Sequence, residues 1–291
     1  MRLRRLAVLS LPWSWLILFV LAPILIVAFI AVSTAGYGSP PIEPALAWQD
    51  GRLALAINFE NFSLLGSDDL YAIAFVNSIG IAASTTFLCL LIGYPIAYVL
   101  ARAPRRLQPL LVMFVILPFW TSFLIRVYAW IGILKDNGLL NNLLLSLGLI
   151  ERPLTILNTP AAVMIGMVYT YLPFLVLPLY ATLQKLDWTL IEAAADLGAK
   201  PWSSFLRVTL PLSLPGMMAG GLLIFVPACG EFVIPELLGS AQLPMIGTVI
   251  WTEFFANRDW PVASAIAIAL LVILSVPLMR IRRRPMAARA P

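Results

Sequence analysis

Long apolar stretches separated by short polar segments run through almost the whole chain. A hydrocarbon core about 30 Å thick requires roughly 20 consecutive apolar residues of helix. Stretches of that kind fall at 12–33, 71–101, 108–134, 160–183, 213–235 and 260–279. The pattern predicts an all-α integral membrane protein with six transmembrane helices.

The first stretch follows the basic segment Met1–Leu6, as the apolar core of a secretory signal peptide would. Such a core usually spans about 7–15 residues, whereas this stretch runs for about 20. We therefore expect a retained membrane anchor.

Composition agrees with a membrane protein. Apolar residues make up 61% of the chain and charged residues 11%, against roughly 25% charged in soluble domains. The sequence contains no histidine. Cys89 and Cys229 lie inside apolar stretches, where we interpret them as small core residues and not as a disulfide or a metal pair.

The basic residues predict the orientation. The formal net charge of +5 could suggest a nucleic-acid partner, but the basic residues lie beside the apolar stretches and indicate topology instead. Alternate connections carry fourteen of them: Arg2, Arg4, Arg5, Arg102, Arg105, Arg106, Lys185, Lys200, Arg207, Arg280, Arg282, Arg283, Arg284 and Arg289. The remaining connections carry Arg52, Lys135, Arg152 and Arg258. The positive-inside rule therefore places both termini in the cytoplasm.

Four segments follow from this topology. Residues 1–34 form a cytoplasmic end and the first transmembrane helix, and 35–70 a long acidic outer loop. Residues 71–279 form the transmembrane core, and 280–291 a basic cytoplasmic tail. The outer loop is either a simple connector or a partner contact. The chain contains no internal repeat, so any pseudo-two-fold symmetry requires a second subunit.

The common catalytic motifs are absent from the sequence. There is no GxxxxGK[ST] phosphate loop, HExxH helix, GxSxG elbow or Cys/His cluster. We therefore expect no catalytic residue, no bound metal and no cofactor. If ATP drives the function, another polypeptide must bind ATP and Mg²⁺.

The cytoplasmic loop at 184–212 has the signals of two short helices. Asp187 can cap a helix that runs to Asp196, and Gly198 falls where a helix end favours a left-handed residue. Pro201 suits the first turn of a second helix through Arg207, and Pro211 begins the transition into the fifth stretch. An interfacial amphipathic hairpin without a partner is the alternative.

This loop resembles the EAA loop of ABC importer permeases. The matching residues are Glu192, Ala193, Ala194, Gly198, Leu210 and Pro211, and Val208 replaces the usual isoleucine. The resemblance implies the type I importer permease fold. It also implies that these residues couple the permease to an ATPase, whose groove receives the first helix of the loop.

Two further segments narrow the resemblance to the spermidine/putrescine permease family. The segment 118–130, PFWTSFLIRVYAW, is similar to the third-span signature of that family, and 229–239, CGEFVIPELLG, to the end of its fifth span. The match covers about 71–279 and implies the first of the two permeases in such systems. The partners would be a second permease, two copies of an ABC ATPase and an extracytoplasmic binding protein, in a bacterial cytoplasmic membrane.

Glu231 is the first candidate on a substrate path. We expect it in the outer half of the fifth span, where a buried carboxylate usually faces a cavity or a partner and could attract a polyamine. Alternatively, Glu231 pairs with Arg126 and only fixes the bundle. Arg126 is a structural or gating candidate, because an unneutralised cation would repel a cationic substrate.

Trp120 and Tyr128 are the other path candidates, since an aromatic face can hold an ammonium group. Trp120, Phe123, Val127 and Trp130 recur at helical spacing, which core packing would equally explain. Gly216 and Gly220 permit close helix contact in the fifth span.

Two other functions remain open. An ABC permease of this kind could move an opine, a quaternary amine, an amino acid such as γ-aminobutyrate, or an anion. A self-contained secondary transporter or channel would leave the EAA loop unexplained and usually shows internal repeats. A membrane enzyme has even less support, because the catalytic motifs are missing.

Overall fold

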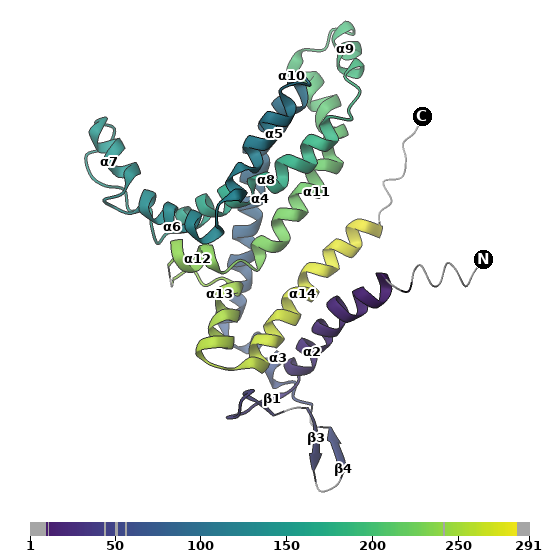
Figure 1. The fold of residues 1–291 in the computed structure, drawn as a ribbon, viewed down its shortest axis with the longest axis vertical. Helices are drawn as coiled ribbons and strands as arrows, with labels where there is room; N and C mark the ends of the chain where they lie inside the picture. The colour runs from purple at the N-terminus through teal and green to yellow at the C-terminus, as the bar shows by residue number, and fades with distance from the viewer. Residues whose placement is uncertain are drawn as a thin grey trace, which may run out of the picture. The chain divides into compact units, whose positions relative to one another are not determined.

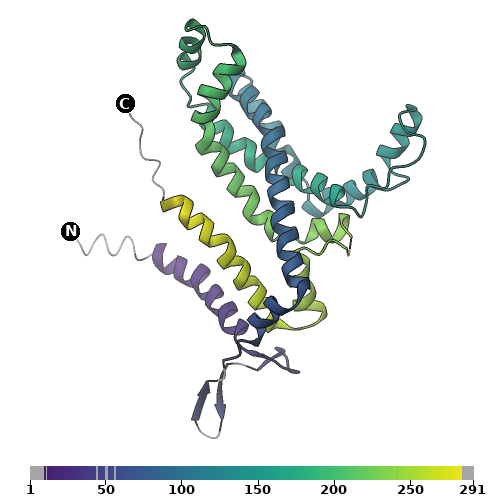
Figure 2. The same ribbon diagram turned by 180° about the vertical axis from the view of Figure 1, so that it is seen from behind.

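The computed structural model describes residues 10, 12–43, 45–49, 52–55, 57–240 and 242–283. The chain forms two compact units, Met1–Phe75 with Ile246–Pro291, and Val76–Met245. The long helix α4 (Asp69–Arg102) begins in the first unit and continues through the second without a break (Figure 2).

The first unit pairs the first and the last described helices. A helix over Pro12–Ala31, which includes the π-helical segment η1 (Ile17–Leu21) and α2 (Ala22–Ala31), packs against α14 (Trp260–Arg283) (Figure 1). The other elements are β1 (Thr34–Ala35), β2 (Ile42–Glu43), β3 (Leu46–Gln49), β4 (Arg52–Leu55), α3 (Glu60–Ser67), α13 (Ile246–Trp251) and η4 (Thr252–Ala256). β1 pairs antiparallel with β2, and β3 with β4.

Buried polar side chains fix the segment that follows α2. Asn61 of α3 donates from Nδ2 to the carbonyl oxygens of Ala31 and Ser33, each at 2.9 Å. The Ser33 hydroxyl donates to the Phe29 carbonyl and accepts from the Ala45 N–H. These bonds satisfy carbonyls that the end of α2 leaves free.

The second unit is a helix bundle. α4, α8 (Pro160–Leu183) and α11 (Leu210–Cys229) are its longest helices, and α5 (Gln108–Ile116) packs on α8 (Figure 1). The remaining elements are η2 (Leu117–Trp120), α6 (Phe123–Leu134), α7 (Leu139–Ser146), α9 (Thr189–Asp196), α10 (Pro201–Ser204), η3 (Phe205–Thr209) and α12 (Val233–Leu238).

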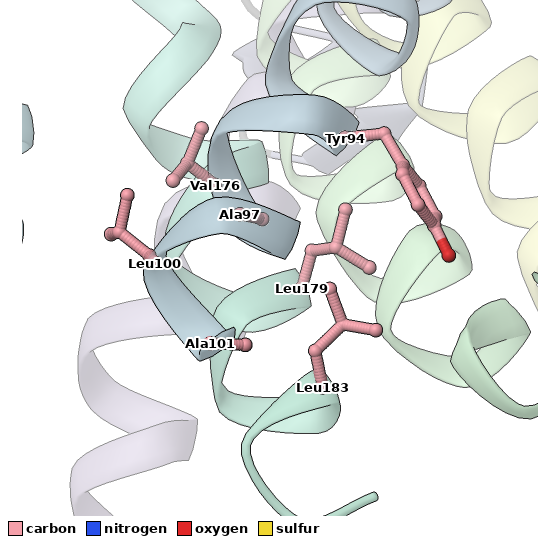
Figure 3. Close-up of a cluster of buried hydrophobic side chains, with 7 residues drawn as sticks. All are labelled: Tyr94, Ala97, Leu100, Ala101, Val176, Leu179 and Leu183. Carbon is pink, nitrogen blue, oxygen red and sulfur yellow. The ribbon is translucent and has the colours of Figure 1, made fainter. Parts of the chain in front are cut away.

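One buried apolar cluster of the bundle lies between α4 and α8. It comprises Tyr94, Ala97, Leu100, Ala101, Val176, Leu179 and Leu183 (Figure 3). Cys89 and Cys229 are also fully buried within helices, as expected for small core residues.

Glycines bring α11 close to α8, as their spacing predicts. A Cβ added at Gly216 would lie 3.2 Å from Leu179 Cα, and one at Gly220 would lie 3.1 Å from Leu175 Cα. A side chain at either position would therefore force the two helix backbones apart.

Four helices among the described residues are long and apolar enough to cross a membrane: Pro12–Ala31, Asp69–Arg102, Pro160–Leu183 and Pro201–Cys229. The bent pair Gln108–Trp120 and Phe123–Ser146 makes a fifth if it counts as one span. Ile246–Ala256 and Trp260–Ser275 are shorter apolar helices. The fold is thus mostly helical, with four or five helices of membrane-spanning length within the described ranges.

The third apolar stretch is not the single helix that we expected over 108–134. The chain bends by 87° between η2 and α6. Pro118 lacks an N–H, and Thr121 leaves the helix with ψ of 152° while its hydroxyl donates to the Pro118 carbonyl at 2.9 Å. Apolar composition conceals this break, because hydropathy alone does not reveal where a helix stops.

The fifth stretch also differs from the expected 213–235. Its helix begins earlier, at Pro201, and ends at Cys229. Gly230, Glu231 and Phe232 lie outside regular helix before α12 begins. The expected placement of Glu231 inside a continuous fifth span is therefore wrong.

Candidate functional site

The first helix of the 184–212 loop forms where its capping signals predict. Asp187 Oδ1 accepts from the Thr189 N–H at 3.1 Å and from the Thr189 hydroxyl at 2.8 Å, which fixes the start of α9. Gly198 has φ of +81°, the left-handed conformation expected of it. The Gly198 and Ala199 N–H groups bond back to the Ala195 and Ala194 carbonyls, so the end of α9 is also capped.

The second helix starts at Pro201 as predicted but does not stop at Arg207. α10, the π-helical η3 and α11 form one helix over Pro201–Cys229. Pro211 therefore lies inside a helix, where a proline normally removes one backbone hydrogen bond. The π-helical turn directly before it changes the hydrogen-bonding register at that point.

The residues of the EAA resemblance are divided between these two helices. Glu192, Ala193 and Ala194 lie on α9, Gly198 lies in the turn, and Leu210 and Pro211 begin α11. α9 has no buried residue. Leu197, directly after α9, is 89% exposed. α9 lies at one end of the second unit (Figure 1).

Two cavities adjoin the bundle side of α9. One of about 1200 Å³ is lined by residues of the α4–α5 turn and of the α8–α9 connection, including Arg102, Arg105, Lys185 and Glu192. The other, of about 740 Å³, lies between α4 and η3. Both cavities are lined by Ile191 and Ala195 of α9.

Gln108 fastens neighbouring ends of three helices to one another. Its Nε2 donates to the Ala103 carbonyl at 2.9 Å, while its Oε1 accepts from Tyr180 Oη at 3.2 Å and from Gln184 Nε2 at 3.1 Å. The ends of α4, α5 and α8 are thus held together beside the larger cavity.

Glu231 is held by its own chain. Its Oε2 accepts from the Tyr171 hydroxyl of α8 at 2.5 Å. Its Oε1 accepts from the Val233 N–H at 3.1 Å, with Ile234 N at 3.5 Å, so the carboxylate caps α12. α12 packs on both α6 and α8, with Gly166 of α8 leaving space for Leu238 and Ile234.

Arg126 has no hydrogen-bond partner for its Nε and Nη1 atoms, both of which are buried. Its guanidinium carbon lies 5.2 Å from the ring centre of Phe119 and 5.8 Å from that of Phe123. In this conformation Arg126 is stabilised by aromatic faces, and Glu231 is bonded to Tyr171 instead of to Arg126.

Trp120 and Tyr128 are on the exposed side of the bent third stretch. Trp120 is 74% exposed at the end of η2, and Tyr128 is 59% exposed on α6. Val127 is buried, and Trp130 packs edge-on against Tyr169 of α8. The break after Trp120 interrupts the helical spacing of the four candidates, so only those on α6 share one helix.

Several contributing side chains were not recognised in the sequence. Tyr171 is only 6% exposed and donates to Glu231, and Phe174 packs edge-on against Phe119 at 5.3 Å. Nothing in the sequence distinguishes these rings from ordinary core aromatics. Within the described ranges, no three His, Cys, Asp or Glu side chains gather as metal ligands.

Known proteins resemble this chain along most of its length. Residues 90–282 match the family model for the binding-protein-dependent transport system inner membrane component. The spermidine/putrescine transport system permease protein PotB of Haemophilus influenzae is 42% identical over 91% of this chain and 88% of its own length. PotB of Escherichia coli K12 is 39% identical over 91% of this chain and 92% of its own.

Solved structures share the fold at low sequence identity. A chain of the bacterial alginate ABC transporter, in complex with a periplasmic protein, matches with a TM-score of 0.68, 18% identity and coverage of 94% of this chain and 90% of that one. A chain of the MetNI methionine ABC transporter matches with a TM-score of 0.55, 16% identity and coverage of 78% and 97%.

Proposed function

The chain belongs to the family of binding-protein-dependent transport system inner membrane components, and on that premise we propose that it is a permease subunit of an ATP-driven polyamine importer. Putrescine and spermidine are the proposed substrates. The observation that carries this proposal is the extent of the identity to PotB, whose name states spermidine/putrescine transport and which is similar over 91% of this chain. The chain is a transporter subunit and not an enzyme.

The proposed orientation places both termini and α9 in the cytoplasm. Six crossings would require the bent pair to count as one span and α14 to count as another. The fourteen basic residues on alternate connections support this arrangement.

The proposed partners follow from the family. The complex contains a second permease, two copies of an ABC ATPase that bind ATP and Mg²⁺, and an extracytoplasmic substrate-binding protein. The chain itself holds no cofactor. α9 docks on one ATPase, and Glu192, Ala193, Ala194 and Gly198 form the docking element. Closure of the ATPases then moves α9 relative to the spans and alternates access to the path.

The proposed substrate path passes Glu231, Trp120 and Tyr128. The two exposed rings offer faces to ammonium groups. The Glu231 carboxylate supplies negative charge, although Tyr171 and the start of α12 already bind it. We propose that the Glu231 carboxylate attracts a cation through its electrostatic field while its hydrogen bonds keep it in place.

A different substrate is the second candidate. The molybdenum transport system permease protein ModB of Mycobacterium bovis is 30% identical over 78% of this chain. Relatives of this family therefore include proteins named for other solutes, and an opine, a quaternary amine or γ-aminobutyrate would fit the same coupling apparatus.

ATP hydrolysis by the reconstituted complex tests the substrate. The complex, with its binding protein, is supplied in turn with putrescine, spermidine, γ-aminobutyrate and an opine. Selective stimulation by a polyamine supports the proposal. Stimulation only by another ligand removes the polyamine assignment and retains the importer.

Reversal of charge at Glu192 tests the coupling. Glu192→Lys changes the charge of the helix that docks on the ATPase, and we expect substrate-stimulated hydrolysis and uptake to fall at least about fivefold. Glu151→Lys makes the same change in an exposed loop and is the control. Unchanged hydrolysis and uptake in Glu192→Lys would contradict the docking role of α9.

A further inference from the structure

Four aromatic side chains connect the 184–212 loop to α4. Tyr98 of α4 lies edge-on to Trp188, just before α9, at 5.8 Å between ring centres, and to Phe205, the first residue of η3, at 6.3 Å. Phe205 is also edge-on to Tyr94 of α4, at 5.4 Å. We call Tyr94, Tyr98, Trp188 and Phe205 the aromatic joint.

Neighbouring groups reinforce both ends of the aromatic joint. The Arg102 guanidinium, at the end of α4, lies 4.9 Å from the ring centre of Trp188. The Trp202 ring stacks on Phe205 at 5.4 Å, with an angle of 21° between the planes. Tyr94, Tyr98 and Arg102 are spaced four residues apart, so they form one stripe along α4 that faces the loop.

α9 lies at the surface of the second unit. None of its residues is buried, and two cavities adjoin its bundle side. α9 also contacts α10 and η3 directly. A displacement of α9 can therefore reach the spans through the backbone on either side of it, through these contacts, and through the ring of Trp188. Aromatic rings have few rotatable bonds, so edge-on contacts transmit displacement with little loss to side-chain rearrangement.

One hydrogen bond also joins the aromatic joint to α11. Tyr94 Oη lies 2.9 Å from Ser213 Oγ of α11, and both residues are buried. The Tyr94 hydroxyl points away from the apolar core cluster, as Figure 3 shows. Because Phe205 and Ser213 belong to the continuous helix Pro201–Cys229, α4 and this helix contact each other at two levels.

We propose that the aromatic joint carries the displacement of α9 into α4 and α11, which makes Tyr94, Tyr98, Trp188 and Phe205 positioning residues for the ATP-driven step. The proposal rests on the proposed coupling role of α9. The cavity of about 740 Å³, lined by Tyr98 and Phe205, gives these rings space to shift together.

The test measures uptake per ATP hydrolysed in the reconstituted complex. Tyr98→Leu removes the central ring, and we expect this ratio to fall at least about fivefold while basal hydrolysis and the yield of assembled complex stay at wild-type values. Tyr98→Phe keeps the ring and should restore the ratio. Phe87→Leu removes an exposed ring from the same helix and should leave the ratio unchanged.

Phe205→Leu and Trp188→Leu provide independent variants if Tyr98→Leu reduces assembly. A double-mutant cycle of Tyr98→Leu with Trp188→Leu should give a loss smaller than the product of the two single losses, because one contact is removed twice. An unchanged ratio in all three single variants would overturn the proposal. Loss of assembly or of basal hydrolysis in parallel with uptake in all three would overturn it too, since the rings would then be only structural.

Glu192→Lys separates this proposal from the one on which it rests. If Glu192→Lys abolishes coupling and Tyr98→Leu does not, α9 docks on the ATPase but transmits its movement by another route. If neither variant changes coupling, the role of α9 itself is wrong.

Discussion

The Glu231 carboxylate shows how a single ionised residue can be stabilised in a membrane protein. One oxygen accepts from the Tyr171 hydroxyl and the other from backbone N–H groups at the start of α12. Charge-assisted hydrogen bonds of this kind are stronger than neutral ones. Glu231 therefore needs no cation beside it, and Arg126 is free for another role.

Removal of the Tyr171 hydroxyl should destabilise this arrangement. Tyr171→Phe deletes a hydrogen bond to a charged group, and we expect a loss of about 1.5–3 kcal/mol in the free energy of unfolding. Tyr169→Phe is the control, because the Tyr169 hydroxyl makes no hydrogen bond in the described structure. Thermal unfolding of the purified complex measures the stability of both variants. Equal stabilities would contradict a stabilising role for the Tyr171–Glu231 hydrogen bond.

Neutralisation of Glu231 should affect transport more than folding. Glu231→Gln keeps an oxygen that can cap α12 but removes the charge, so we expect assembly to persist and uptake of a polyamine to weaken, with a higher KM. Uptake kinetics across putrescine concentrations measure the effect. Unaltered kinetics would show that Glu231 only shapes the α11–α12 connection.

Interactions between residues close in the sequence could be predicted, whereas those between residues far apart in the sequence could not. Asp187 and Gly198 act on backbone groups a few residues away, so their roles could be predicted from spacing alone. Tyr171 meets Glu231 across 60 positions. That contact depends on how α8 packs, which residue types do not specify.

At the scale of elements, glycines shape the contact between α8 and α11. Gly216 and Gly220 let the two backbones approach, with Thr182 and Leu175 against them. Gly221, on the next position of α11, has a different environment, since an added Cβ there would lie 3.6 Å from Thr86 Cγ2. The two adjacent glycines, Gly220 and Gly221, thus differ in the room that each leaves for a side chain.

A pair of alanine substitutions tests this difference. A Cβ at Gly220 would lie 2.7 Å from Leu175 Cδ1 and 3.1 Å from Leu175 Cα, so Gly220→Ala should destabilise the chain by about 1–3 kcal/mol. Gly221→Ala has room and gains helix propensity, so it should be neutral or stabilising. Thermal unfolding compares the stabilities of the two variants. Equal stabilities would show that α11 moves away from α8 to accommodate the Cβ at Gly220.

Elements with capping signals were predicted better than breaks inside apolar stretches. α8 and α9 lie close to their expected positions. The breaks at Thr121 and Gly230 were missed, because residues on either side are apolar and hydropathy is insensitive to backbone angles. The bond from the Thr121 hydroxyl to the Pro118 carbonyl, which completes the turn, is not visible in the sequence.

For the whole molecule, the exposed apolar surface indicates what the chain requires around it. In the helix Pro12–Ala31, only 6% of the most apolar window is buried within the chain. Trp13, Leu18 and Phe19 are each more than half exposed. Such a surface must face lipid or another membrane subunit.

Purification with co-encoded neighbours should therefore yield a heteromeric complex. We expect this chain to co-purify with a different permease and an ATPase in detergent or nanodiscs. The sequence contains no internal repeat, so a second permease must supply the other half of a pseudo-two-fold substrate path. Native mass spectrometry gives the stoichiometry. A stable homodimer active in transport would contradict this architecture.

Span number and orientation could be proposed from hydropathy and basic residues, because both depend on the bilayer more than on tertiary contacts. The packing of α2 with α14 could not, since the two segments are far apart in the sequence. The family resemblance came from the loop at 192–211 and from the segments 118–130 and 229–239, because it compares residues along the chain and needs no knowledge of packing.

If α9 docks on an ATPase as proposed, the continuous helix Pro201–Cys229 places the 184–212 loop at one end of a lever. At 1.5 Å per residue the helix is about 43 Å long, and its tight contact with α8 at Gly216 and Gly220 lies nearer the far end. If that contact serves as the fulcrum, the arms measure roughly 25 Å and 16 Å. A push on Pro201 then swings Cys229 in the opposite direction by about two-thirds of the distance. Inward movement at the ATPase would thus become outward movement beside Glu231, without any bending of the rod.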